Sequence, residues 1–386
     1  MTAANPVRVA FVLPGLHRVS RGAETAFEAV ARELAKRSDF DVTLIGSGEQ
    51  RSGEPYKFIH ADITPREKFE KWPRIPPMRN EYRWEELSFV RPIRRVYRPQ
   101  NFDVTVTCSF PFVNWLLRAG RKDKRPRHVF VTQNGDWPAQ RKNAEYKFFS
   151  CDGLVCTNPE YFDRQKNTWR CALIPNGIDA TQFTPGSGPR AEFGIPADAK
   201  VVLMVSALIP SKRILEGLRA IARVPDVFFL AAGDGPLRAE FDSLATQLMP
   251  GRFRRLTTTM DKMPSLYRCA DAFLHMSREE AFGNVYIEAL ATGLPVIAHD
   301  YTTARWILSP EISMIGNSAP ANFQSLETFG WLVNTANETA IADVIRAALA
   351  SPREHAQARH DFAASRFAWP IVAKKYASFL TEVARS

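Results

Sequence analysis

The stretch Ser277-Arg-Glu-Glu-Ala-Phe-Gly-Asn-Val-Tyr-Ile-Glu-Ala-Leu-Ala-Thr-Gly-Leu-Pro-Val-Ile-Ala298 is the most informative part of this chain. Its two carboxylates, Glu280 and Glu288, lie on either side of a Phe-Gly pair. In one continuous helix they would be about 12 Å apart along the axis and on partly different faces. Gly283 argues against that, because glycine is unfavourable inside a helix and common where a loop turns into one. We therefore expect Glu280 and Phe282 in a loop, a helix that begins near Gly283, and Glu288 in its early turns.

This arrangement predicts a ligand site. A loop-to-helix junction directs unpaired backbone N–H groups toward one point, and that point favours an anion. Both carboxylates would face the same pocket, where they can accept hydrogen bonds from sugar hydroxyls. Carboxylates beside a phosphate site suit an enzyme that uses nucleotide sugars. The alternative is an amphipathic helix with two solvated glutamates, since charged residues are mostly exposed.

The pattern Glu-x-Phe-Gly-x-x-x-x-Glu, followed by Gly293-Leu-Pro-Val296, resembles the signature of the retaining glycosyltransferases of family 4, which have the GT-B fold. The resemblance implies that Glu280 contacts the donor sugar and that Glu288 holds the ribose diol. It also places three neighbouring residues near the sugar and the diphosphate: Phe282, Gly283 and Asn284.

Length and composition describe an ordinary two-domain protein. The chain has 386 residues, 45% of them apolar and 24% charged. No apolar run approaches the roughly 18 residues of a membrane helix, and the N-terminus lacks the pattern of a signal peptide. Five scattered cysteines favour reduced thiols over a disulfide frame, and their spacing does not suit a zinc site. These are Cys108, Cys151, Cys156, Cys171 and Cys269. We expect a cytoplasmic protein that needs no metal or other cofactor.

The formal charge of +10 is compatible with nucleic acid, an anionic membrane surface or a polyanionic substrate. Between Arg66 and Arg98, ten Lys or Arg residues stand against five Asp or Glu residues, with six aromatic residues interleaved. No nucleic-acid recognition motif accompanies the charge, so we expect no nucleic-acid partner. We assign segment 66–98 to the acceptor side, in contact with the inner face of an anionic membrane or with a lipid-linked or acidic glycan. The alternative is a loop and helix whose charges are merely solvated.

Strand-like and helix-like segments alternate along the chain, which predicts an α/β protein with parallel sheets. Apolar residues at helical spacing predict a helix from about Glu24 to Lys36 and another after Trp369-Pro370. Pro, Asn and Gly interrupt the pattern at 173–179. The expected strands cover residues 8–13, 41–45, 104–107, 129–132, 153–156, 201–205, 227–230, 272–275, 295–298 and 330–334.

The resemblance turns this pattern into an architecture. It implies two Rossmann-like domains that face a central cleft, with a C-terminal helix that crosses back to the N-terminal domain. Residues 1–174 would bind the acceptor, with 66–98 as a basic-aromatic insertion, and residues 175–365 would bind the nucleotide-sugar donor. Residues 366–386 would form the returning helix.

Loops that follow strands supply the remaining donor-side candidates, since ligands of open α/β sheets lie beyond the carboxyl ends of the strands. Lys212 matches a phosphate-binding lysine of the resembled family. Ala207 stands where that family has an arginine and Arg213 where it has a glycine, so we expect Arg213 to supply part of the missing charge. Gly233 and Gly235 permit a close approach of backbone to the nucleotide. Two solvated surface cations are the alternative at 212–213.

The N-terminal domain matches the family less well. Gly22 is the candidate for facing the diphosphate, and His17 in the same loop is a candidate acceptor contact or simply a solvated side chain. Many members of the family have a histidine after the strand at 129–132, where this chain has Gln133-Asn-Gly-Asp-Trp137. Asn134 and Asp136 are candidate replacements for contacts with sugar hydroxyls, and Asn-Gly is equally a plain turn.

The resemblance implies an activity. The enzyme would transfer a hexose-type sugar from a nucleotide diphosphate-sugar to a hydroxyl with retained anomeric configuration. The acceptor would be a glycan, a lipid-linked molecule or a small molecule, in cell-surface polysaccharide or glycolipid biosynthesis. Glu280, Lys212 and Arg213 would carry the reaction without a metal ion. The alternatives are a nucleotide-sugar epimerase or hydrolase on the same scaffold, and a binding protein without catalysis.

Overall fold

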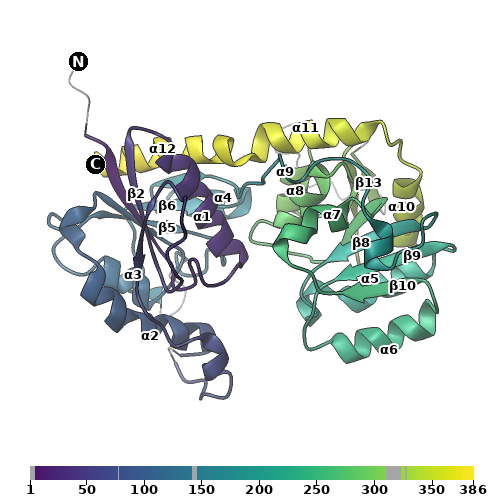
Figure 1. The fold of residues 1–386 in the computed structure, drawn as a ribbon, viewed down its shortest axis with the longest axis horizontal. Coiled ribbons are helices and arrows are strands. Elements are labelled where there is room, and N and C mark those ends of the chain that lie inside the picture. Colours follow the sequence, from purple (N-terminus) through teal and green to yellow (C-terminus); the bar gives the residue numbers. More distant parts are fainter. Residues whose placement is uncertain (1–4, 77, 141–145, 310–322, 327) are drawn as a thin grey trace. The chain divides into compact units, whose positions relative to one another are not determined.

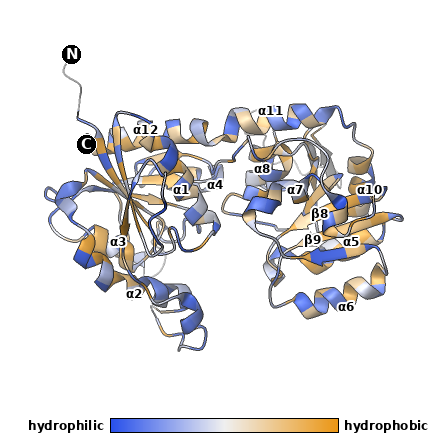
Figure 2. Cartoon of the chain, in the orientation of Figure 1, coloured by the Kyte–Doolittle hydropathy of each residue, from blue (hydrophilic) through white to orange (hydrophobic). Residues whose placement is uncertain are grey.

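The computed structural model describes residues 5–76, 78–140, 146–309, 323–326 and 328–386. The chain forms two compact units. Unit 1 comprises Met1–Asn176 and Trp369–Ser386, and unit 2 comprises Gly177–Ala368. Each unit has a central sheet with helices on both faces (Figure 1). The strands of both sheets are predominantly hydrophobic (Figure 2).

Unit 1 contains a seven-stranded parallel sheet in the order β3-β2-β1-β4-β5-β6-β7. Its strands are β1 (Val7–Val12), β2 (Phe40–Gly46), β3 (Lys57–His60), β4 (Val104–Thr107), β5 (Arg127–Val131), β6 (Gly153–Cys156) and β7 (Cys171–Leu173). Its helices are α1 (Gly22–Ala35), α2 (Glu81–Val96), α3 (Phe112–Leu117), α4 (Pro159–Gln165) and α12 (Trp369–Ala384).

Alternate residues of each strand in unit 1 pack on opposite faces of the sheet, as strand geometry requires. Val9 and Phe11 of β1 lie in a core with α1 and α12. Ala10 and Val12 of the same strand lie in a second core with α2 and α3. Burial on both faces explains why the central strands appear as continuous apolar runs in the sequence.

Unit 2 contains a seven-stranded sheet in the order β10-β9-β8-β11-β12-β14-β13. Its strands are β8 (Lys200–Val205), β9 (Val227–Ala232), β10 (Phe253–Leu256), β11 (Ala272–His275), β12 (Val296–His299), β13 (Phe323–Ser325) and β14 (Gly330–Val333). The other six strands are parallel, as predicted, and the short edge strand β13, which was not predicted, is antiparallel to β14.

The helices of unit 2 form two layers. One core holds α7 (Met263–Tyr267), α8 (Asn284–Ala291), α9 (Thr302–Leu308) and α11 (His355–Phe367). The other holds α5 (Ile214–Ala222), α6 (Arg238–Leu248) and α10 (Glu338–Leu349). Because β8, β9, β11 and β12 are parallel, their carboxyl ends lie at the same edge of the sheet.

The predicted α/β class with two Rossmann-like sheets is confirmed, and the predicted strands in the centre of each sheet are present. The prediction missed the outer strands β3, β7, β10 and β13. Where their burial is described, these strands are short and only partly buried, as in the Phe-Arg-Arg-Leu sequence of β10. An edge strand of this kind carries no continuous apolar run, so its sequence does not stand out.

The C-terminal helix α12 belongs to unit 1, as expected from the fold. Its apolar face, formed by Val372, Tyr376, Leu380 and Val383, is buried against α1 and the sheet. The five cysteines are all free thiols.

Segment 66–98 contains regular secondary structure. It contains a short 3-10 helix, Arg66–Phe69, and nearly half of it is α2, whose N-cap Asn80 accepts a hydrogen bond from the Arg83 N–H. Phe69, Trp72 and Trp84 form an aromatic cluster with ring centroids 4.9 to 6.1 Å apart. Trp72 is 48% exposed, so this cluster reaches the surface.

Candidate functional site

The donor-side candidates gather at the carboxyl edge of the unit 2 sheet. The loop after β8 carries Lys212 and Arg213, the loop after β9 carries the two glycines, and the loop after β11 carries Glu280. Parallel strands bring these loops to the same edge, which is where open α/β sheets bind ligands.

Glu280 is the centre of a charged cluster. Its Oε1 is paired with Lys212 Nζ and also accepts a hydrogen bond from His275 Nε2 at 2.8 Å. Burial alone would raise the pKa of this carboxyl, but the hydrogen bonds and electrostatic interactions with His275 and Lys212 outweigh burial and lower the pKa to about 2. Glu280 is therefore a carboxylate at neutral pH, held in position by two donors. Lys212 and Glu280, which are 68 residues apart in sequence, are in direct contact.

Glu288 lies in a different environment. It is buried in the fifth position of α8, and its Oε2 accepts a hydrogen bond from the Tyr267 hydroxyl at 2.7 Å. Burial raises the pKa of Glu288 to about 7, although the bond from Tyr267 opposes the shift. At neutral pH the site thus holds one fully ionised carboxylate and one that is close to half protonated.

The predicted loop-to-helix turn is present. Gly283 precedes α8 with φ +88°, a left-handed conformation that favours glycine. A Cβ at this position would lie 2.7 Å from the ring of Tyr286, so the turn also needs the absence of a side chain. The Phe282 ring points into the core, 5.8 Å from the Phe367 ring between centroids, so only its backbone is available to a ligand. Asn284 is the first residue of α8.

Arg213 has an unusual backbone. It lies at the N-cap of α5 with φ +54°, the left-handed region in which a side chain is unfavourable. This conformation accounts for the glycine found here in the resembled family. The guanidinium donates to Glu216 Oε1 at 3.1 Å and to Thr335 Oγ1 at 2.8 Å. The charge of Arg213 is therefore held beside the predicted site by two partners.

The glycine loop after β9 packs directly on the loop after β8. A Cβ on Gly233 would lie 1.9 Å from the Ser206 carbonyl oxygen, and one on Gly235 would lie 2.6 Å from that of Leu208. Neither position can accept a side chain without displacing backbone. The two glycines therefore hold the loop that carries Lys212 against the edge of β9.

In unit 1, His17 is neither an open acceptor contact nor a solvated side chain, so both expectations are wrong. It is buried, with the ring stacked on Phe58 at a centroid distance of 4.1 Å. Its Nε2 bonds the Tyr56 hydroxyl at 2.9 Å and its Nδ1 bonds the Glu49 carbonyl at 2.8 Å. Both ring nitrogens are used to hold the loop after β1.

Asp136 is used by the fold in a similar way, and this corrects its assignment to sugar hydroxyls. It is buried, and its carboxylate accepts hydrogen bonds from Arg164, Gln140 and Gln165, each at 2.8 Å. Asn134 is exposed, and its carbonyl accepts from Trp137 Nε1 at 2.9 Å. Gly22 is exposed and is the first residue of α1.

Sequence reasoning missed His275 and Tyr267, the partners of the two glutamates. His275 is the last residue of β11, 2% exposed, and its Nδ1 has no hydrogen-bond partner in the described part of the chain. The signal available in the sequence was its place at the carboxyl end of a predicted strand, immediately before the Glu280 loop. Tyr267 belongs to the short helix α7, and no sequence signal linked it to Glu288.

No group of three or more His, Cys, Asp or Glu side chains in the described ranges is arranged to hold a metal ion. None of the helices that the structure describes is both long and apolar enough to cross a membrane.

Two family models match the chain in succession. The model "Glycosyltransferase Family 4" matches residues 20–182, and "Glycosyl transferases group 1" matches residues 189–365. The chain belongs to the GT-B glycosyltransferases of the family 4 type. The first model covers most of unit 1 and ends at residue 182, just inside unit 2. The second model lies entirely within unit 2.

Curated glycosyltransferases align with part of the chain. The lipopolysaccharide core biosynthesis glycosyltransferase LpsE of Rhizobium meliloti is 30% identical over 204 residues, which is 50% of this chain and 56% of LpsE. The D-inositol 3-phosphate glycosyltransferase of Mycolicibacterium smegmatis is 38% identical over 140 residues, 33% of this chain and 32% of that enzyme. The chain thus spans between a third and somewhat over half of the length of these relatives.

Solved structures of the same fold align over nearly the whole chain. Sucrose-phosphate synthase from Thermosynechococcus elongatus has a TM-score of 0.76 at 18% identity and covers 98% of this chain and 100% of its own. HepE of Anabaena, solved in complex with UDP and glucose, has a TM-score of 0.70 at 17% identity and covers 97% and 100%. These likenesses establish the GT-B fold.

Proposed function

We propose that this protein transfers a hexose-type sugar from a nucleotide diphosphate-sugar to a hydroxyl group, with retained anomeric configuration and without a metal ion. The observation that carries the proposal is the contact between Lys212 and Glu280 at the carboxyl edge of the unit 2 sheet. Family membership and this contact point to the same chemistry.

The contact joins two functions that the reaction needs. Cleavage of the anomeric C–O bond builds negative charge on the leaving diphosphate, and a preorganised cation stabilises that charge. Lys212 and Arg213 are such cations, and the N–H groups of the first turn of α8 after Gly283 add to them. Glu280, ionised and fixed by His275, is an acceptor for hydroxyls of the donor sugar.

Glu288 suits the nucleoside end of the donor. Its buried carboxyl is fixed by Tyr267, and one oxygen remains for a ribose hydroxyl. A group with a pKa near 7 can both donate and accept hydrogen bonds around neutral pH. Gly233 and Gly235 let the loop after β9 pack against the loop that carries Lys212, which fixes the position of that cation.

The acceptor proposal rests on unit 1 and on the relatives. LpsE is named for lipopolysaccharide core biosynthesis, so we propose a glycan or lipid-linked acceptor in cell-surface biosynthesis. The exposed Trp72 and the basic residues of segment 66–98 favour peripheral contact with an anionic membrane. Co-sedimentation with phosphatidylglycerol vesicles at low salt tests this contact, and a Trp72→Ala variant that sediments as fully as wild type would contradict it.

The activity is tested in two steps. Thermal shift with UDP, GDP, ADP and CDP identifies the base, because a bound ligand raises the melting temperature. The matching nucleotide sugars are then incubated with and without acceptor glycans in the presence of EDTA. Formation of an α-linked product from an α-linked donor, as seen by NMR, is the expected result.

The donor-only reaction separates the alternatives. A nucleotide-sugar epimerase would change the donor without an acceptor, and a hydrolase would release free sugar at full rate. A protein that binds a nucleotide diphosphate but converts no donor under any acceptor condition would contradict transfer. Loss of activity in EDTA with recovery on adding Mg²⁺ would contradict metal independence.

A further inference from the structure

Unit 2 has a polar cavity at the opposite edge of its sheet from the donor loops. The cavity has a volume of about 520 Å³. Lys200 opens β8, Asp271 directly precedes β11, and Pro295 directly precedes β12, and all three line it. Because these strands are parallel, the cavity lies at their amino ends, whereas Lys212 and Glu280 follow their carboxyl ends. A strand the length of β8 separates the two edges by roughly 20 Å.

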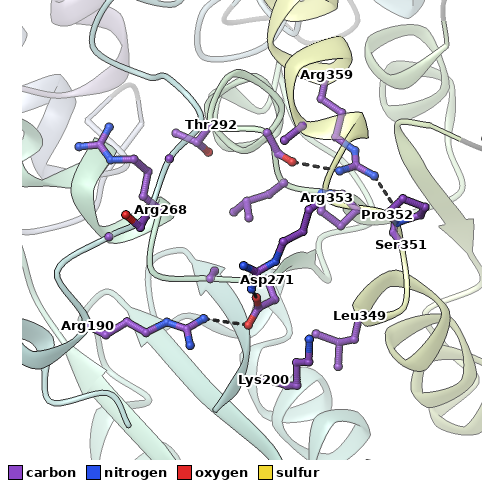
Figure 3. A pocket seen from close by; sticks show the side chains of 18 of the residues that line it. Arg190, Lys200, Arg268, Asp271, Thr292, Leu349, Ser351, Pro352, Arg353 and Arg359 are labelled. Carbon is purple, nitrogen blue, oxygen red and sulfur yellow. Dashed lines mark hydrogen bonds and ion pairs between the residues drawn. The ribbon is translucent and has the colours of Figure 1, made fainter. Parts of the chain in front are cut away.

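The lining of the cavity is strongly basic. Five cations surround it with a single carboxylate, Asp271, which leaves a formal excess of four positive charges (Figure 3). The five cations are Arg190, Lys200, Arg268, Arg353 and Arg359.

Two of the cations are held by the protein and contribute mainly their charge. Arg190 bonds Asp271 at 2.9 Å as well as three carbonyl groups. Arg359 is only 1% exposed and bonds two carbonyl oxygens and the Ser351 hydroxyl, and no carboxylate of the described residues pairs with it. Burial lowers the pKa of Arg359 to about 10, which leaves it charged at neutral pH. A buried cation without a paired anion is costly, and a bound anion would offset that cost.

The other three cations have donors to give to a ligand. Lys200 is exposed and forms no ion pair or hydrogen bond with the residues described. The Arg268 guanidinium points away from Asp271 (Figure 3) and donates to the Gln182 carbonyl and the Ser265 hydroxyl, so a ligand would have to draw it into the cavity, but no carboxylate in the described part of unit 2 pairs with its charge. Arg353 is 85% exposed and shares Asp271 with Arg190.

We propose that this cavity is a second ligand site, which binds a small phosphate monoester. A dianion would neutralise two of the four excess positive charges, and the cavity has room for an organic group besides the phosphate. α8 runs between the two edges: its N-cap Gly283 follows the loop of Glu280, and its C-cap Thr292 lines the cavity. The site is separate from the donor site, so this proposal does not depend on the reaction proposed above.

The test is calorimetric titration of the full chain with glycerol 3-phosphate, with inorganic phosphate, and with glycerol as the neutral control. Both phosphates should bind saturably and glycerol should not. The double substitution Lys200→Gln, Arg268→Gln should weaken binding by about ten-fold or more, because it removes two charge-assisted donors. Both residues are at least partly exposed, so the variant should fold, and an unchanged melting temperature without ligand checks that.

Two matched variants locate the binding. Arg219→Gln removes one exposed charge from α5 of the same unit and should leave the affinity unchanged. Lys212→Ala removes the donor-site cation and should also leave it unchanged. Absence of saturable binding to wild type would overturn the proposal. So would binding that is lost in Lys212→Ala and kept in the double variant.

A third arm separates a soluble ester from a lipid headgroup. Wild type and the Lys200→Gln, Arg268→Gln variant are sedimented with phosphatidylglycerol vesicles. Equal sedimentation of the two proteins supports a soluble ligand. Vesicle binding that requires Lys200 and Arg268, together with no binding of glycerol 3-phosphate, would overturn the proposed ligand class.

Discussion

The carboxyl edges of the two sheets use polar residues in opposite ways. In unit 2, Glu280 contacts both Lys212 and His275. The side chains of Lys212 and Glu280 are 24% and 16% exposed. In unit 1, His17 and Asp136 occupy comparable loops after β1 and β5, but every polar atom that they offer is bonded within the unit. Polar residues in loops after strands form the proposed donor site in unit 2, whereas in unit 1 they stabilise the loops themselves.

The difference shows that a polar residue in a loop after a strand can serve either a ligand or the loop itself. Loops at the edge of a sheet must satisfy their own backbone and polar groups, and a buried histidine or aspartate is a common way to do so. The unit 2 loops are instead held by Gly233 and Gly235, whose backbones pack on the neighbouring loop. That packing leaves the charged side chains of unit 2 available for a ligand.

The largest expected effect is on catalysis in unit 2. Lys212→Ala removes a preorganised cation and should lower the rate of sugar transfer by about 100-fold or more. Steady-state kinetics with the identified donor measure it, with Arg219→Ala as the matched control on the same unit. A loss of less than three-fold would remove Lys212 from the reaction and with it the contrast between the two units.

Glu288 should make the stability of the protein depend on pH. Its folded pKa of about 7 lies above the ordinary value of 4.5, so the folded protein retains a proton that the unfolded chain releases. The free energy of unfolding should therefore decrease by roughly 3 kcal/mol in total as the pH rises from about 4.5 to 7.

Glu288→Gln should abolish this loss. The melting temperature of the variant relative to wild type should therefore be higher at pH 8 than at pH 5. Glu279→Gln, which changes an exposed glutamate directly before Glu280, is the control. Identical pH profiles for wild type and Glu288→Gln would show that Glu288 is ionised in the folded protein.

In unit 1, substitution should affect stability and spare chemistry. Asp136→Asn weakens the ion pair with Arg164 and the bonds from two glutamines, and should cost about 2 kcal/mol of unfolding free energy. Differential scanning calorimetry measures the loss. The kcat of the variant, assayed well below its melting temperature, should stay within two-fold of wild type. A ten-fold lower kcat with an unchanged melting temperature would place Asp136 in the reaction and remove the contrast.

The smallest effect is expected at Arg213. Arg213→Gly removes the strain of a side chain in the left-handed backbone conformation, which should stabilise the fold by about 1 kcal/mol. It also removes the bonds to Glu216 and Thr335. The two terms nearly cancel, so unfolding should change by less than about 1 kcal/mol. Titration with the nucleotide diphosphate should show about five-fold weaker binding if the charge of Arg213 reaches the diphosphate. Unchanged affinity would assign Arg213 to the fold alone.

Much of the site geometry was predictable because it depends on local rules. The turn at Gly283 and the start of α8 follow from the conformational freedom of glycine. The central strands follow from apolar runs that only a sheet covered on both faces explains. Partners distant in sequence were not predictable. Nothing near Glu288 indicates Tyr267, and nothing near His17 indicates Tyr56 or Phe58.

The sequence by itself determined the α/β class, the family resemblance and the order of the donor loops, because each depends on a periodic or local pattern. Tertiary structure alone decided the chemical state of the residues in those loops. It lowers the pKa of Glu280 through Lys212 and His275, and it raises the pKa of Glu288 to about 7 by burial. It also engages the side chains of His17 and Asp136 in hydrogen bonds within unit 1. The physical reason is that protonation and hydrogen bonding depend on distance and burial, and the fold sets both by bringing together residues that are far apart in the chain.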